Sequence, residues 1–314
     1  MNARRPSLVI SLIINLVMAS SCIAGESSGW SGAQASQACR LCLYQPDNMA
    51  FDAQGDIYLV DTDHKHRSRI LKLSQAGKKL ADWRVFTDGP GSDNGPNGIA
   101  IDGRGNIYAP DGAAQRVLKL SPTGKVIQIF GPMKGSFKYV HVAVGADGDV
   151  YVVEPEQNAI EKLSPDGKRL ARWHRERGSG ADQWREPQTI SIGKDNTLVL
   201  LDWGNDRIEI LSDGGVTRRI FRAAGAPNEP LVSSSGACTD SDGGIYVADY
   251  QRNRIKEYDP AGHLVKTIGN DGSRKIFEHA PFSMACGRDG NLYSADGLSV
   301  VKYSKDGAVL ARWR

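Results

Sequence analysis

His141 and Glu154 are the residues of this sequence whose types and spacing best suit catalysis. An apolar run begins at His141, a tight turn lies at residues 145–149, and a second apolar run ends at Glu154. Antiparallel pairing through that turn places His141 beside Val153 and Glu154. A histidine next to a carboxylate can act as a general base or bind a metal, with the acid fixing its tautomer. A histidine that only hydrogen-bonds its neighbour explains the same pattern, so both roles stay open.

Glu154 belongs to a set of six acidic residues that follow apolar runs at intervals of 43 to 50 residues. The six are Asp61, Asp111, Glu154, Asp202, Asp249 and Asp296. Four of them are followed in the next loop or strand by an arginine, namely Arg69, Arg116, Arg207 and Arg254. An acid in this position is expected to accept loop N–H bonds and to pair with the arginine, which is a structural role. Glu154 and Asp296 lack this arginine, so they are the better candidates for a site.

A third set of residues stands at the start of the run that precedes each acid. Its members are Asn48, Gly98, His141, Thr189, Gly236 and Ser283. If the runs pack around a common centre, these residues and the acids meet at one end of it, where loops on a rigid scaffold can bind a ligand. The predicted ligand-binding residues are therefore Asn48, His141, Glu154, Thr189, Ser283 and Asp296.

A metal site is a further hypothesis. His64 and His66 lie in the insertion DTDHKHRS together with Asp63, and His279 precedes the last copy of the pattern. Imidazole and carboxylate ligands suit zinc, and a ring of acids suits calcium, so a divalent cation is the cofactor that the sequence allows. An exposed polar loop explains the same residues. The sequence contains no nucleophile elbow, phosphate-binding loop or HExxH motif.

The spacing of turns and apolar runs predicts the fold. Three residues after each inner run comes a residue that tolerates positive φ: Gly55, Gly105, Gly148, Asn196, Gly243 and Gly290. The last run of each copy holds a bulky residue that is expected to pack neighbouring copies together: Trp83, Phe130, Trp173, Phe221, Ile268 and Trp313. Six copies of four short strands predict an all-β protein, a six-bladed β-propeller over residues 46–314, each blade using its own four strands.

The repeats resemble those of the NHL family of six-bladed propellers. The matching segments are PNGIAIDGRGNIYAPDGAAQRVLKLSPTGK, GGIYVADYQRNRIKEYDPAGH and, as a linker between blades, GSGADQWREPQTISI. The resemblance implies the fold but not one function, because propellers of this kind include amidating lyases, streptogramin lyases, gluconolactonase-type hydrolases, and adhesion or RNA-binding modules. The amidating lyases hold zinc with histidines from several blades, whereas here only blade 3 has a histidine at the start of its inner strand.

The N-terminal region predicts export. Arg4 and Arg5 precede a short apolar run, so residues 1–24 are expected to be an export signal, which makes the location extracytoplasmic: secreted, periplasmic or held at the cell envelope. Ala19-Ser20-Ser21-Cys22 resembles a lipoprotein cleavage site, so a lipid on Cys22 would attach the protein to a membrane surface. Ordinary signal cleavage after Ala24 is the alternative, and the sequence leaves both open. Residues 25–45 are a Ser/Gly-rich linker with Cys39 and Cys42. The formal charge of +3 is thinly spread, which argues against a nucleic-acid partner.

Cys238 and Cys286 are predicted on the inner strands of adjacent blades, where a disulfide and two buried thiols are both possible. Two functions remain open. The first is an exported module that binds a peptide, a glycan or a partner protein through one face. The second is a metal-assisted lyase or hydrolase with His141 as base and with Glu154 and Asp296 holding the cation or the substrate. The sequence does not decide whether the protein is an enzyme.

Overall fold

The computed structural model describes residues 41, 43–63, 67–87, 98–133, 139–222, 234–269, 281, 283–295 and 299–314. The chain divides into two compact units, Met1–Cys42 with Arg314, and Leu43–Trp313. In the first unit, the backbone N–H of Leu41 donates to the carbonyl of Arg314 at 3.0 Å. The expected export signal and cysteines 22, 39 and 42 lie outside the described residues. No helix in the described ranges is long and apolar enough to cross a membrane.

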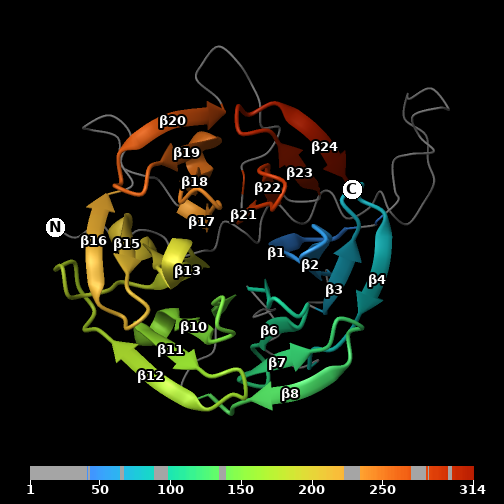
Figure 1. The fold of residues 1–314 in the computed structure, drawn as a ribbon, viewed down its shortest axis with the longest axis horizontal. Helices are drawn as coiled ribbons and strands as arrows, with labels where there is room; N and C mark the ends of the chain where they lie inside the picture. The colour runs from blue at the N-terminus through green and yellow to red at the C-terminus, as the bar shows by residue number, and fades with distance from the viewer. Residues whose placement is uncertain are drawn as a thin grey trace. The chain divides into compact units, whose positions relative to one another are not determined.

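The second unit consists of six four-stranded antiparallel sheets, each built from four consecutive strands (Figure 1). Blade 1 contains β1 (Pro46–Phe51), β2 (Ile57–Thr62), β3 (Ser68–Leu73) and β4 (Lys79–Trp83). Blade 2 contains β5 (Ala100–Ile101), β6 (Ile107–Asp111), β7 (Arg116–Leu120) and β8 (Val126–Phe130). Blade 3 contains β9 (His141–Val144), β10 (Val150–Glu154), β11 (Ala159–Leu163) and β12 (Arg169–His174).

The other three blades follow the same plan. Blade 4 contains β13 (Pro187–Ile192), β14 (Leu198–Asp202), β15 (Arg207–Leu211) and β16 (Thr217–Arg222). Blade 5 contains β17 (Ser234–Thr239), β18 (Ile245–Asp249), β19 (Arg254–Tyr258) and β20 (Leu264–Gly269). Blade 6 contains β21 (Ser283–Cys286), β22 (Leu292–Ala295), β23 (Val300–Tyr303) and β24 (Val309–Trp313). The predicted all-β, six-bladed propeller is confirmed.

Among the described connections, four contain a short 3₁₀ helix. The helices are η2 (Pro155–Gln157), η3 (Lys194–Asn196), η4 (Trp203–Asn205) and η5 (Tyr250–Arg252). Three of them follow the second strand of blades 3, 4 and 5, and each ends at a left-handed Asn or Asp. The predicted positive φ in the first turn of every blade is confirmed, from 55° at Asn196 to 88° at Gly243.

The bulky residue on each outer strand packs against the next blade, as predicted. A Cβ added at Gly124 would lie 2.3 Å from the Trp83 ring, and one at Gly215 would lie 2.3 Å from the Trp173 ring. Glycine is therefore needed in these turns both for its positive φ and for the space that the neighbouring ring fills. The indole N–H of Trp313 donates to the carbonyl of Ala76 at 3.2 Å, so blade 6 packs on blade 1 in the same way.

The inner strands are also joined between blades. Cys238 of β17 and Cys286 of β21 form a disulfide, which decides between the two alternatives that the sequence left open. The rings of Phe51 and Tyr293 lie 4.7 Å apart between blades 1 and 6. Each blade's core is therefore shared with its neighbour, and the six inner strands are held around one centre.

Candidate functional site

Four of the six acids that end the second strands are paired with arginine. The ion pairs are Asp61 with Arg69 at 2.8 Å, Asp111 with Arg116 at 3.0 Å, Asp202 with Arg207 at 2.9 Å and Asp249 with Arg254 at 2.8 Å. Each acid also lies opposite or near its arginine in the strand register. The predicted structural role of these four acids is confirmed.

Backbone N–H groups satisfy the same carboxylates. The N–H groups of Tyr44 and Gln45 each donate to Asp61 Oδ1 at 2.9 Å, and that of Arg185 donates to Asp202 Oδ1 at 2.8 Å. Burial raises the pKa of Asp61 and of Asp202, although these donors and the arginines act in the opposite direction. These acids therefore hold in place the chain that leads into the inner strand. Because their carboxylate oxygens already accept hydrogen bonds, they have little capacity left to bind a ligand.

Glu154 is also paired, and the expectation that it lacks an arginine is wrong. Arg172 of β12 donates from Nη2 to Glu154 Oε2 at 2.8 Å, and its Nε lies 3.4 Å from Glu161. Sequence reasoning searched the third strand, where blade 3 has Ala159, but the arginine comes from the fourth strand. The sequence places Arg172 directly before the bulky residue Trp173 of the outer strand, but no spacing shared with the other blades indicated that it pairs with Glu154. The acid of blade 6, Asp296, lies outside the described residues.

The starts of the inner strands lie against one another between blades. A Cβ added at Gly98 would lie 2.9 Å from the Val142 nitrogen, and one at Gly236 would lie 2.8 Å from the Met284 nitrogen. The hydroxyl of Ser283 donates to the backbone carbonyl of Asp47 at 2.6 Å. The structure therefore brings the strand starts of blades 2 and 3, of blades 5 and 6, and of blades 6 and 1 into contact.

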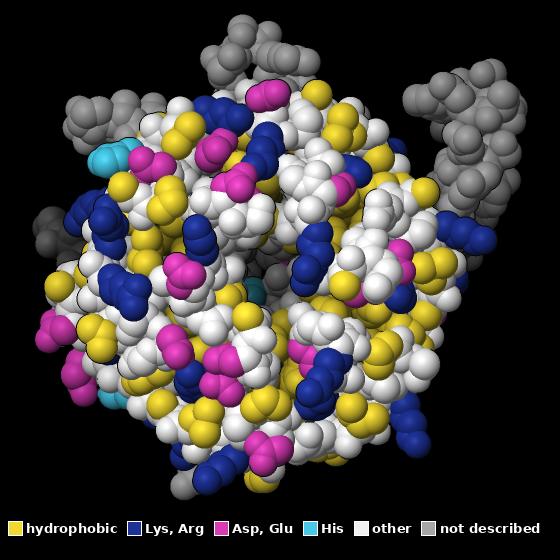
Figure 2. Space-filling view, in the orientation of Figure 1, with side chains coloured by type: hydrophobic (Ala, Val, Ile, Leu, Met, Phe, Trp, Pro, Cys, Tyr) yellow, Lys and Arg dark blue, Asp and Glu magenta, His cyan; other side chains and the backbone are white. Residues whose placement is uncertain are grey.

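The six inner strands surround a central hollow, which the space-filling view shows in the middle of the face (Figure 2). Each inner strand is covered outward by its own blade and sideways by its neighbours, so solvent reaches its side chains from this hollow or from the strand ends. The inner strands begin at one end of the hollow, at residues such as His141 and Ser283. We call this end the upper mouth.

Two titratable side chains at the upper mouth have strongly shifted pKa values. Burial raises the pKa of Asp47 to about 7 and lowers the pKa of His141 to about 4. Both side chains keep partial contact with solvent, yet protein surrounds them. No side-chain hydrogen bond or ion pair of either residue occurs within the described ranges, so neither shift is offset by a partner. His141 is therefore neutral at pH 7, and Asp47 is near the midpoint of its titration.

His141 and Glu154 do not form the predicted dyad in this structure. His141 is the register partner of Val153, as expected, but the Glu154 carboxylate bonds to Arg172 rather than to the imidazole. Burial raises the pKa of Glu154, and the Arg172 bond counteracts this. Of this predicted pair, the structure leaves the neutral imidazole of His141 available at the mouth.

Thr189 is a further polar residue at the mouth without a partner. Its side chain is buried, and its Oγ1 makes no hydrogen bond to the described residues. Asn48, which shares this position in blade 1, is partly exposed. Of the predicted ligand-binding residues, the structure thus describes Asn48, His141, Thr189 and Ser283 at the mouth, and Glu154 behind it.

Sequence reasoning missed Asp47. Three inner strands contain an irregularity in register near their start, between Pro46 and Met49, Pro187 and Ile190, and Ser234 and Ala237. Each is an extra residue on the inner strand, the geometry of a β-bulge, which re-aims the side chains around it. Counting back from the turn therefore identified Asn48 and passed over its neighbour.

The predicted metal site is not tested, because His64, His66 and His279 lie outside the described residues. The carboxylate of Asp63 accepts from Arg67 Nη2 at 2.7 Å and from Nε at 2.9 Å. No group of three or more His, Cys, Asp or Glu side chains suited to a metal occurs in the described part of the chain.

No family model matches the chain, and no curated protein sequence matches it. The NHL resemblance accordingly stays a prediction. Among solved structures, the chain is similar to a streptogramin B lyase, with 17% identity, coverage of 88% of this chain and 85% of that chain, and a TM-score of 0.63. It is also similar to a catalytically inactive histidine-to-alanine variant of virginiamycin B lyase from Staphylococcus aureus with quinupristin (15% identity, 88% and 86% coverage, TM-score 0.63).

A gluconolactonase from Xanthomonas campestris is a third similar structure (16% identity, 82% and 85% coverage, TM-score 0.58). At these identities the likeness shows the fold and nothing finer. The class defined by fold and comparisons is a six-bladed propeller whose structural neighbours include lyases and a lactonase.

Proposed function

We propose that the protein works outside the cytoplasm as a propeller that binds an uncharged, hydrogen-bonding ligand in the upper mouth of the central hollow. The ligand classes that fit are a glycan and the backbone of a peptide or partner protein. The observation behind this proposal is the contrast between the acids, whose carboxylates are satisfied, and Asp47, His141 and Thr189, which have no partner among the described residues.

Charge decides the ligand class. His141 is neutral at pH 7 because burial lowers its pKa to about 4, and Asp47 is only partly ionised because burial raises its pKa to about 7. The acids next to the mouth are neutralised by Arg69, Arg207 and Arg172. A mouth lined in this way offers donors and acceptors without a strong fixed charge, which favours hydroxyl and amide groups over ions.

Binding of neutral probes to the purified protein tests the proposal. Isothermal titration with neutral oligosaccharides and with short peptides blocked at both ends should find at least one that binds saturably. Thr189→Val keeps the shape of the side chain and should weaken that binding about tenfold, because one hydrogen bond to the ligand is lost. Thr123→Val is the matched control, because the Thr123 hydroxyl forms a hydrogen bond with that of Ser121 in an exposed turn. This variant should leave binding unchanged. No binding by any probe, or equal affinity of wild type and Thr189→Val, would count against the proposal.

A second candidate is a metal-assisted lyase or hydrolase with His141 as base. Its support is the neutral imidazole, which can accept a proton, together with structural neighbours that are lyases and a lactonase. Elemental analysis separates the two functions. A stoichiometric divalent cation, calcium or zinc, that is lost in His141→Ala supports the enzyme. Absence of bound metal from the wild-type protein removes it.

A further inference from the structure

A cavity of about 200 Å³ lies between blades 1 and 6 at the lower face, where the first and third turns of each blade are found. Phe51, at the end of β1, contributes one wall, whereas Asp47 is four residues earlier on the same strand. At roughly 3.3 Å per residue, the cavity is about 13 Å along the strand from the upper mouth. It is therefore separate from the site proposed above.

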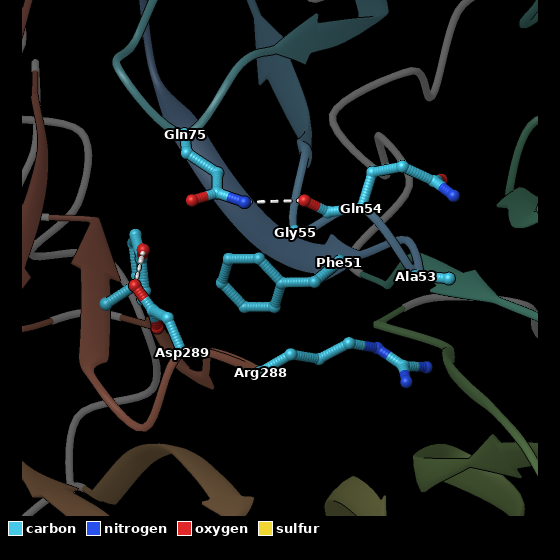
Figure 3. Close-up of a pocket in the computed structure, with 8 residues that line it drawn as sticks. Phe51, Ala53, Gln54, Gly55, Gln75, Arg288 and Asp289 are labelled. Carbon is cyan, nitrogen blue, oxygen red and sulfur yellow. Dashed lines mark hydrogen bonds between the residues drawn. The ribbon is translucent and has the colours of Figure 1, made fainter.

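The cavity combines an apolar wall with one cationic side chain. Its lining includes Phe51, Ala53, Gln75, Arg288 and Tyr293. Figure 3 shows the Phe51 ring at the centre of the lining residues, with the Arg288 side chain extended past it and away from Asp289. The Phe51 ring packs on Tyr293, which fixes it between the two blades. Gln75 is held at the rim because its amide donates to the Gln54 carbonyl.

The positive charge of Arg288 is not neutralised by the acid next to it. Asp289 accepts from Lys302 at 2.7 Å and from the Tyr293 hydroxyl at 2.9 Å. Burial alone would raise the pKa of Asp289, but these and the Asn291 hydrogen bonds lower it to about 2, so it is fully ionised and already paired. Arg288 itself is exposed and makes no hydrogen bond or ion pair with the described residues. The local charge is therefore positive beside the Phe51 ring.

We propose that this cavity binds a small aromatic carboxylate, whose ring stacks on Phe51 and whose carboxyl group pairs with Arg288. A guanidinium presents two parallel N–H donors that match a carboxylate. The cavity has room for roughly six water molecules at about 30 Å³ each, which suits a ligand with a single ring. Gly55 and Ala53 keep its opening free of larger side chains.

Benzoate is the probe that tests this inference. Titration followed by isothermal calorimetry or NMR should show saturable binding with a dissociation constant of about 1 mM or below. Arg288→Gln should weaken binding about 10- to 100-fold, because it removes a charge-assisted hydrogen-bonding pair. Phe51→Leu should weaken it severalfold by removing the stacked ring. Benzamide, which has the same ring without the charge, should bind more weakly than benzoate.

Blade 4 supplies the matched control. Lys194 occupies the same turn position as Arg288, directly after the glycine that ends the inner strand, and it does not line the cavity. Lys194→Gln removes one positive charge from an equivalent turn and should leave benzoate binding within about twofold of wild type. No saturable benzoate binding, or equal losses in Arg288→Gln and Lys194→Gln, would overturn the inference. Because the residues of the upper mouth are unchanged in these variants, either result is independent of the function proposed for that site.

Discussion

The acids at the ends of the second strands and the residues at the upper mouth lie at the same end of the blades but differ in how their polar groups are satisfied. Asp202 is fully buried and is bonded by Arg207 and by the Arg185 N–H. Asp47 and His141 are partly exposed and have no side-chain partner in the described ranges. In the five blades where it is described, the recurring carboxylate therefore stabilises the scaffold, whereas polar residues that occur in one blade are available for a ligand.

The largest effect on stability is expected from breaking one of the buried pairs between an acid and an arginine. Arg207 pairs with both Asp202 and Glu209, and neither acid is exposed to solvent. Arg207→Gln leaves the buried carboxylate of Asp202 without its cation and leaves Glu209 with Arg175 alone, which should lower the free energy of unfolding by about 3–5 kcal/mol. Urea denaturation followed by circular dichroism measures the change. Arg116 is partly exposed, and its one ion pair among the described residues is with Asp111, so Arg116→Gln should lower the free energy of unfolding by less. Equal losses would contradict the distinction.

Asp47→Asn is expected to have the next largest effect, with a defined pH dependence. The pKa of Asp47 is raised to about 7, so the folded state holds this proton more tightly than the unfolded chain. The wild type therefore loses stability as pH rises from about 4 to about 7, and the variant does not. Above pH 7 the variant should be more stable by about 2–4 kcal/mol, since one pKa unit corresponds to about 1.4 kcal/mol. Thermal unfolding at pH 4 and pH 8 measures this; a pH-independent difference would argue against the buried acid.

His141→Gln should show the opposite pH dependence. The pKa of His141 is lowered to about 4, so the unfolded chain binds the proton first as pH falls. Stability is fully present above about pH 6.5 and is lost as pH falls toward 4. As pH falls from about 6.5 to about 4, the free energy of unfolding of the variant should therefore rise by about 1–3 kcal/mol relative to that of the wild type. The same thermal scans measure it, and a gain at high pH instead of low pH would be the contrary result.

Thr189→Val should produce the smallest change, and in the stabilising direction. Its buried hydroxyl has no partner among the described residues, so replacement by a methyl group should add about 1 kcal/mol to the free energy of unfolding. Thr217→Val is the matched contrast, because its hydroxyl accepts from Arg175 and donates to Glu209. That variant should be destabilised. A loss of stability in Thr189→Val would mean that its hydroxyl is satisfied.

The repeat-based features could be predicted from the sequence because each appears in several copies. Gly243 and Asn196 have the positive φ that their place in the turn requires, and the pairing of Asp249 with Arg254 follows from a spacing shared by three blades. Trp83 and Trp173 pack against glycines of the next blade, which the regular spacing also indicated. Repetition supplies the control that a single sequence otherwise lacks.

The site was less predictable because its residues occur once. Asp47 was missed because a bulge adds a residue to β1, and a bulge shifts side-chain direction without leaving a clear mark in composition. Glu154 was taken as unpaired because its arginine comes from a different strand from that of the other acids. An arginine on either the third or the fourth strand of a blade can pair with this carboxylate. Only the three-dimensional structure shows which of the two strands supplies it.

The upper mouth contains an acid, Asp47, and a histidine, His141, whose side chains have no polar partner among the residues that the structure describes. An NMR pH titration of the purified protein, following the Asp47 carboxyl carbon and the His141 ring, measures this directly. We expect a pKa of about 7 for Asp47 and of about 4 for His141. Values near about 4 for Asp47 and about 6.5 for His141 would contradict the account, because they are those of solvated side chains.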